Sequence, residues 1–169
     1  QTRLWDTWNH MFKLMAAAKA LGAPVDYVGE EDDFGKYPFL IAPAYQLVDA
    51  ALVEKWRRYA EGGGHLFLTC RTGQKDKNGQ LFEAPWAGMI GTLIGAEVGM
   101  FDSLLADGRG RVRLGAAGYE WNRWADILIP RHGTETLAVY ADQFDAGSPA
   151  VLTRQLGRGS VTYIGVDSL

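Results

Sequence analysis

The chain has 169 residues, of which 47% are hydrophobic and 22% charged, a balance that fits one globular domain with a substantial core and excludes intrinsic disorder. A net charge of -3, with lysines and arginines scattered along the chain, argues against a nucleic-acid partner, and no apolar run approaches the roughly 20 residues of a membrane helix. The single cysteine, Cys70, excludes an internal disulfide and a cysteine-based zinc cluster.

The first 33 residues predict a helix, a short strand and a loop. Apolar side chains recur every three or four positions over residues 2–21, and Gly22 ends this helix. The β-branched and aromatic segment 24–29 predicts a strand. The acidic residues 30–33 that follow are interpreted as a solvated cluster and not as a paired acid and base.

A β-α-β unit follows. Residues 39–42 are continuously apolar, as expected for a central strand of a parallel sheet that is covered on both faces. Asp49 can cap a helix that runs to about Glu61 and is ended by the glycines 62–64. Residues 65–70 then predict a second buried strand, reached by a right-handed crossover.

The second half of the chain predicts mainly short strands. A short helix over residues 87–94 is closed by Gly95. Runs that alternate or are continuously apolar, separated by turn residues, predict strands at 96–104, 111–114, 136–141, 150–156 and 160–166. The chain starts without an initiator methionine in a predicted helix and stops just after a strand, so we expect a fragment of a longer protein.

Cys70 is the one candidate nucleophile. It ends the second strand of the β-α-β unit, where a class I glutamine amidotransferase-like fold carries its catalytic cysteine on a tight turn. No glycine precedes it by two positions, and none of the histidines is placed as a base, because His10 lies in a helix, His65 begins the strand and His132 lies in a turn. A small, half-buried strand residue is the favoured interpretation.

The sequence predicts neither a cofactor nor a metal site. A glycine-rich loop that leads from a strand into a helix is absent, and the glycines 62–64 occur in the reverse order, after a helix and before a strand. No histidine pair has metal-ligand spacing. A solvated face is the favoured interpretation for the remaining candidate acid-base carboxylates, Asp102, Asp107, Glu120, Asp126 and Asp142.

Large aromatic side chains in the less regular middle region form a candidate contact surface. Trp86, Phe101, Trp121 and Trp124 fall in predicted loops or short segments, and such residues are favoured where a subunit or a sugar packs on a surface. The alternative is that they cap the sheet of this domain. Both interpretations stay open from the sequence.

Several segments in a fixed order resemble the middle domain of glycoside hydrolase family 42 β-galactosidases, and they cover nearly the whole chain. These segments are residues 37–44, 59–73, 78, 85–86, 93–98, 124–126, 137–140, 146–151 and 157–159. The resemblance implies a three-layer α/β domain of the flavodoxin or class I glutamine amidotransferase-like type, with a largely parallel central sheet and extra short strands in the C-terminal half. It also implies that the catalytic residues of the amidotransferase fold are missing and that the parent enzyme forms a homotrimer through this domain.

The same resemblance implies that residues 1–169 are one domain of a multidomain chain. A (β/α)8 barrel with the two catalytic glutamates, and the zinc-binding cysteines of some members, is expected upstream, and a small β domain downstream. The parent is expected to cleave terminal β-galactosides with retention. The strand that normally opens the family's domain is absent here or reduced to a few residues.

The leading hypothesis is therefore a non-catalytic oligomerisation domain of a soluble, cytoplasmic β-galactosidase, with galactoside as a substrate of the parent enzyme only. No catalytic, cofactor-binding or metal-binding residue is expected in this chain. Two alternatives are a stand-alone amidotransferase-like or trehalose-utilisation-like domain that uses Cys70, and a carbohydrate-binding module.

Overall fold

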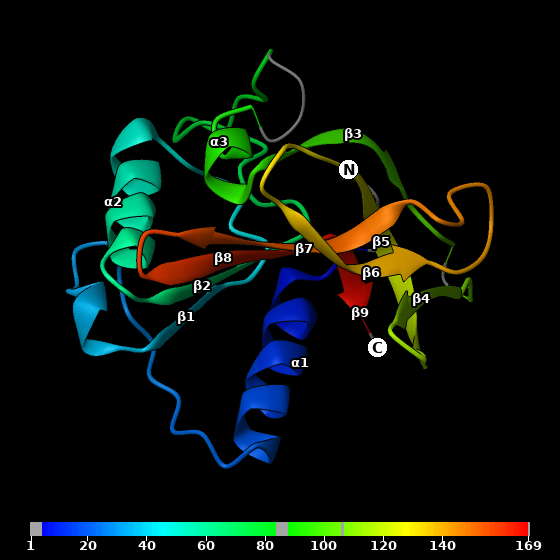
Figure 1. Ribbon diagram of the computed structural model, residues 1–169, viewed down its shortest axis with the longest axis horizontal. Helices are drawn as coiled ribbons and strands as arrows, with labels where there is room; N and C mark the ends of the chain where they lie inside the picture. Colours follow the sequence, from blue (N-terminus) through cyan, green and yellow to red (C-terminus); the bar gives the residue numbers. More distant parts are fainter. Residues whose placement is uncertain (1–4, 84–87, 106, 169) are drawn as a thin grey trace.

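The computed structural model describes residues 5–83, 88–105 and 107–168, and within them nine strands form one sheet (Figure 1). The strands follow the order β1, β2, β8, β7, β6, β4, β5, β3, and β9 pairs with β5. Their bounds are β1 Phe39–Ala42, β2 His65–Thr69, β3 Ala96–Asp102, β4 Gly110–Leu114, β5 Ala117–Pro130, β6 Glu135–Tyr140, β7 Pro149–Leu156, β8 Gly159–Ile164 and β9 Val166–Ser168. The helices are α1 Thr7–Ala20, α2 Ala50–Glu61 and α3 Gly91–Ile94, with a 3-10 turn at Phe34–Lys36.

The sheet is mixed. β1, β2 and β8 are parallel neighbours, whereas every other strand pair among the described residues is antiparallel. The expectation of a largely parallel sheet thus holds only for the β-α-β unit and its neighbour β8. It is corrected for the rest, because short strands joined by tight turns, such as β7 and β8, can only pair antiparallel. β1 lies at the end of the strand order, so its predicted central place is wrong.

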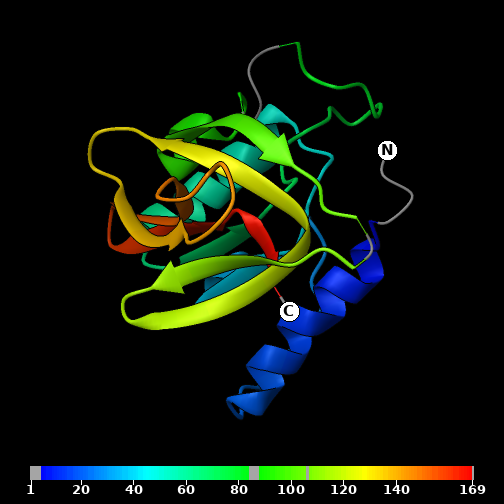
Figure 2. The ribbon, with the colours of Figure 1, turned by 90° about the vertical axis from the view of Figure 1, so that its right-hand side faces the viewer.

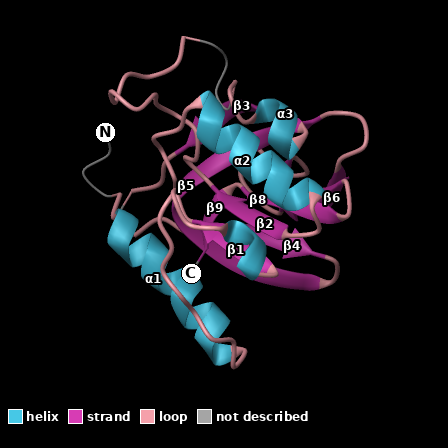
Figure 3. Cartoon of the chain, turned by 90° about the vertical axis from the view of Figure 1, so that its left-hand side faces the viewer, coloured by secondary structure: helices cyan, strands magenta, loops and turns pink. Residues whose placement is uncertain are grey.

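Helix α2 covers one face of β1, β2 and β8 (Figure 3). Asp49 caps this helix by accepting a hydrogen bond from the backbone N–H of Leu52 at 2.8 Å, as the sequence predicts. Leu52 and Trp56 lie on its buried face, while Glu54 and Arg58 form an ion pair on the solvent side. Burying a side chain such as Leu52 contributes about 1.5–3 kcal/mol, so this face fixes α2 on the sheet.

Glycines let the end of α2 approach β2 and β8 closely. A Cβ on Gly64 would collide with the ring of Tyr59, and a Cβ on Gly159 would collide with the carbonyl oxygens of Gly64 and Ala60. The glycines that stop the helix therefore also allow the close packing of three elements at this corner.

β5 organises the second half of the domain. Its first part pairs with β4 and its last part with β3, and Figure 2 shows it curving across this side of the sheet in yellow. A bulge between Asn122 and Ala125, where Arg123 has a φ of 64°, changes the register against β9. Trp121 and Tyr140 lie in a second, smaller core beside this strand. No strand was predicted from the sequence over the range of β5.

Helix α1 lies on the side of β1 and β2 that faces away from α2 (Figures 1 and 3). His10 is its one buried residue among those described, and the Asp6 side chain caps it. Residues 24–29 form no strand, so that prediction is wrong. The predicted helix over 87–94 is reduced to α3, and residue 87 lies outside the described residues.

Candidate functional site

Buried polar side chains gather where β2 ends, at the edge where open α/β sheets usually hold their sites. Thr69 is the last residue of β2, and Cys70 and Arg71 follow it. Asp126 comes from β5 and Asp167 from β9. All five residues are buried, although they come from segments that lie far apart in the sequence. The fold therefore creates a polar centre at the position where related folds carry out chemistry.

Cys70 has the position of a nucleophile but not its surroundings. Its side chain is fully buried, and its backbone N–H donates to the carbonyl of Ile164 at 2.7 Å. Burial raises the pKa of the Cys70 thiol well above its ordinary value, and the carboxylates of Asp126 and Asp167 raise it further. Because the thiolate is the reactive form, both the burial and the raised pKa disfavour reaction of this thiol.

No histidine serves Cys70 as a base. His10 is buried, and its two ring nitrogens are engaged by Asp167 Oδ1 and Thr69 Oγ1, each at 2.8 Å. His65 lies at the other end of β2 and pairs with Ser160, and His132 is exposed in a turn. Among the described residues the site thus holds no nucleophile and base in contact.

The His10 contacts tie three elements together. Lys13 Nζ donates to Asp167 Oδ1 at 2.5 Å, beside the His10 ring. Thr69 Oγ1 accepts a hydrogen bond from the backbone N–H of Ala44 at 2.7 Å and also contacts His10. A His10 ring protonated on Nδ1 donates to Asp167 and accepts from the Thr69 hydroxyl, so every partner is satisfied. This cluster anchors α1 to β2 and β9.

Asp126 is held by three donors. Its carboxylate accepts hydrogen bonds from Trp124 Nε1 at 2.8 Å, from the Tyr163 hydroxyl at 2.7 Å and from the Arg71 backbone N–H at 3.1 Å. Burial raises the pKa of Asp126, although these hydrogen bonds act in the opposite direction. Five carboxylates in the second half of the chain were candidate acid-base groups from the sequence, and Asp126 is the buried one among them. Its carboxylate therefore does not face a sugar pocket.

Arg71 is the unusual member of this centre. Its backbone has a φ of 69°, and its guanidinium carbon lies 4.8 Å from the Trp5 ring centroid and 4.4 Å from that of Trp124. Only 6% of the residue is exposed, and Nε and Nη1 have no hydrogen-bond partner. Arg71 was not predicted from the sequence as a site residue, and its one signal there is a charged residue directly after a buried strand.

The candidate aromatic surface is only partly at the surface. Phe101 is 45% exposed, and its ring stacks on Trp124 at 4.6 Å with an interplanar angle of 3°. Trp124 is buried, and Trp121 is buried in the second core against Tyr140. Both tryptophans lie on β5 and not in loops, which corrects that part of the prediction. Trp86 lies outside the described residues.

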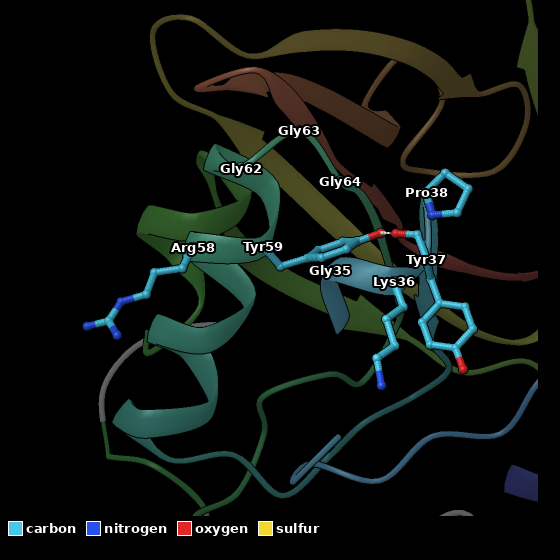
Figure 4. Close-up of a pocket in the computed structure, with 9 residues that line it drawn as sticks. All are labelled: Gly35, Lys36, Tyr37, Pro38, Arg58, Tyr59, Gly62, Gly63 and Gly64. Atoms are coloured by element: carbon cyan, nitrogen blue, oxygen red, sulfur yellow. Dashed lines mark hydrogen bonds between the residues drawn. The ribbon is translucent and has the colours of Figure 1, made fainter. Parts of the chain in front are cut away.

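The surface also has a hollow of about 450 Å³ at the C-terminal end of α2 (Figure 4). Its lining residues are Gly35, Lys36, Tyr37, Pro38, Arg58, Tyr59, Gly62, Gly63 and Gly64. The Tyr59 hydroxyl donates to the Tyr37 carbonyl at 3.0 Å, and Lys36 and Arg58 extend away from each other. The nine lining residues include no carboxylate, imidazole or thiol, and the hydroxyl of Tyr59 is already engaged by the Tyr37 carbonyl.

Other features of the described chain add no reactive group. Glu30 of the acidic cluster is paired with Lys77 and accepts a hydrogen bond from Tyr45, so it is an ion-pair partner. Within the described ranges, no three His, Cys, Asp or Glu side chains are grouped to bind a metal ion. The helices of the described part are all too short or too polar to span a membrane.

Comparison with known proteins identifies relatives over nearly the full chain. The profile of a family described as β-galactosidase trimerisation domain matches residues 1–168. The β-galactosidase BgaH of Haloferax lucentense is 35% identical over 161 residues, which cover 95% of this chain and 24% of the relative. The β-galactosidase LacA of Lactobacillus acidophilus is 29% identical over 84% of this chain and 21% of its own length.

Solved structures give the same result. The β-galactosidase from the haloarchaeon Halorubrum lacusprofundi superposes with a TM-score of 0.93 at 31% identity, covering 99% of this chain and 25% of the relative. Gan42B, described as a GH42 β-galactosidase, superposes with a TM-score of 0.93 at 26% identity, covering 100% and 25%. The chain thus spans about a quarter of the length of the relatives it matches.

Proposed function

The chain belongs to the family of β-galactosidase trimerisation domains, and on this basis we propose that it is the non-catalytic assembly domain of a β-galactosidase-type glycoside hydrolase. The family match over residues 1–168 carries the proposal. The burial of Cys70 supports the non-catalytic role, because a buried thiol with a raised pKa and no neighbouring base does not act as a nucleophile. The domain's contribution is then to hold copies of the parent protein together, most simply as a homotrimer.

The chemistry of the parent protein lies outside this chain in our proposal. The relatives of known length are about four times as long as this chain, which leaves room for a catalytic barrel upstream and a small β domain downstream. The parent would hydrolyse terminal β-galactosides with retention, using two carboxylates of that barrel. A cytoplasmic location belongs to the same proposal, and fractionation of cells that produce the parent protein would test it.

We place the contact surface of the trimer around Phe101. Phe101 is partly exposed, and its ring stacks on Trp124. Trp121 and Trp124 would act from beneath, as buried supports of β5. Trp86 belongs to the same proposed surface by sequence.

We also propose that the region around β1, β2 and β8 represents the three-layer, flavodoxin or amidotransferase-like part of the domain. The support is that α2 lies on one side of these parallel strands and α1 on the other. Cys70 then occupies the place of the nucleophile in related enzymes. The remaining antiparallel strands would be an addition to that core.

The rival functions have less support. An amidotransferase-like reaction needs an accessible thiolate, whereas Cys70 is fully buried. A carbohydrate-binding module needs an open aromatic platform in a hollow, and the Tyr59 ring in the surface hollow is buried. The test is to replace Cys70 by Ala and by Ser in the full-length protein and to measure hydrolysis of a chromogenic β-galactoside. We expect unchanged turnover in both variants. Loss of turnover in folded Cys70→Ala protein would contradict a purely structural role of this cysteine.

A further inference from the structure

Arg71 is a buried cation with unused hydrogen-bond donors. Nε and Nη1 are sealed from solvent without a partner, although buried polar groups are nearly always hydrogen-bonded. Nη2 makes no hydrogen bond to any of the residues that the structure describes, and it is not among the sealed atoms. A guanidinium binds a carboxylate through two adjacent N–H groups, so an anion that arrives at Nη2 can also reach one of its two neighbours.

The acidic residues nearby do not satisfy Arg71. The Asp126 carboxylate accepts hydrogen bonds from the Arg71 backbone N–H, from Trp124 Nε1 and from the Tyr163 hydroxyl. It makes no hydrogen bond with the Arg71 guanidinium. Asp167 is engaged by His10 and Lys13. None of the ion pairs within the described residues includes Arg71. Among the described residues the guanidinium is therefore attracted by the nearby Asp126 carboxylate but forms no ion pair with any carboxylate, which is unfavourable for a buried cation unless a partner supplies one.

The surroundings hold this cation in one place. Trp5 and Trp124 flank the guanidinium, and Phe101 stacks on the far face of Trp124, which gives a row of four flat groups. The left-handed backbone of Arg71 is fixed by its hydrogen bond to Asp126. Such strained, over-determined residues cluster at binding sites, and Arg and Trp dominate the centres of protein interfaces.

We propose that Arg71 receives an Asp or Glu side chain from a second copy of the full-length protein when the copies assemble. The bidentate pair would form through Nη2 and one adjacent nitrogen, beside the stack of Phe101 on Trp124. This inference rests on the proposed assembly function and names its partner chemistry. A second copy is favoured over a free anion because the half-exposed Phe101 ring gains nothing from a small ion, whereas a protein surface would bury it.

The experiment uses the full-length protein and three variants. Arg71→Met removes the charge but keeps a side chain of similar length between the two indole rings. Arg71→Lys keeps the charge but cannot donate two parallel hydrogen bonds to one carboxylate. Arg58→Met is the matched control, because the Arg58 side chain is 77% exposed on α2. Sedimentation equilibrium gives the dissociation constant of the assembly, and circular dichroism reports folding.

We expect Arg58→Met to match the wild type and Arg71→Met to raise the dissociation constant at least about tenfold while the fold is kept. Arg71→Lys should show a smaller increase in the same direction. If Arg71→Met does not fold, the Arg71→Lys comparison alone decides. Wild-type dissociation constants in both folded Arg71 variants would overturn the carboxylate site and leave the assembly function standing.

Two further outcomes separate the alternatives. A wild-type protein that is monomeric at every concentration would overturn the assembly function itself. A second titration tests whether the carboxylate comes from another copy or from solution. Acetate is added to the wild-type protein, and chloride at equal ionic strength is the control. A saturable change in tryptophan fluorescence at unchanged mass would mean that a free carboxylate occupies Arg71, and it would overturn the choice of a second copy.

Discussion

His10 Nδ1 in the first helix lies 2.8 Å from Asp167 Oδ1 in the last strand, although 157 positions separate the two residues. Both side chains are buried, and His10 is the one buried residue of α1 among those described. The other ring nitrogen of His10 binds Thr69 at the end of β2. The polar cluster around His10 is therefore the buried anchor of α1, whose apolar residues Met11, Leu14 and Met15 are only partly buried.

The first prediction concerns this anchor. Replacing His10 by Ala leaves Asp167 without one buried partner, and we expect a loss of about 2–3 kcal/mol in the free energy of unfolding. Urea denaturation followed by circular dichroism measures the change. His132→Ala, in an exposed turn, is the matched control and should change stability by less than about 0.5 kcal/mol. Equal effects of the two substitutions would contradict the anchoring role.

The second prediction concerns the reactivity of Cys70. Because the thiol is fully buried and its pKa is raised, we expect no reaction with a thiol reagent in the native protein and one equivalent after unfolding in urea. The reagent is added at neutral pH, and the labelled residue is identified by mass spectrometry. Rapid native labelling at Cys70 would mean that the end of β2 opens to solvent.

The third prediction is a dependence of stability on alkaline pH. Cys70 keeps its proton when folded but ionises near pH 8.5 when unfolded, so its contribution to stability is complete below that pH. As the pH rises further, the unfolded state gains by ionising, and stability should fall by up to about 1.4 kcal/mol per pH unit. Cys70→Ala removes this part of the slope between about pH 8.5 and the onset of tyrosine ionisation near pH 10. Identical slopes for the two proteins would contradict the assignment.

The fourth prediction concerns Phe101 on the proposed contact surface. Phe101→Ala should weaken self-association of the full-length protein by about tenfold or more, because exposed aromatic anchors carry much of the energy of an interface. Phe144→Ala is the control, since Phe144 is 66% exposed in the turn between β6 and β7. Light scattering over a dilution series measures both variants. A control that weakens assembly as much as Phe101→Ala would move the contact surface elsewhere.

Local signals explain what the sequence could predict. Asp49 caps α2 and glycines 62–64 end it, so the β-α-β unit follows from residues that are neighbours in the chain. β5 was not predicted because its bulge at Arg123 breaks the alternation of inward and outward side chains. As a result, Trp121 and Trp124, three positions apart, are both buried.

The polar centre at the end of β2 was beyond prediction for a different reason. The convergence of β2 and β5 brings together Arg71, Trp124 and Asp126. A periodic sequence pattern reports only on neighbours along the chain, so it cannot predict a contact between residues 55 positions apart. The lack of a workable base for Cys70 was predictable, because the three histidines are few enough to be placed one by one. The structure adds the complete burial of the thiol, which disfavours its reaction.

Sedimentation equilibrium of the full-length protein, measured over a range of concentrations, tests the assembly role most directly. Our account predicts a species with three times the mass of one chain, which dissociates only on dilution. A single-chain mass at all concentrations, in a preparation that hydrolyses β-galactosides at full rate, would contradict it.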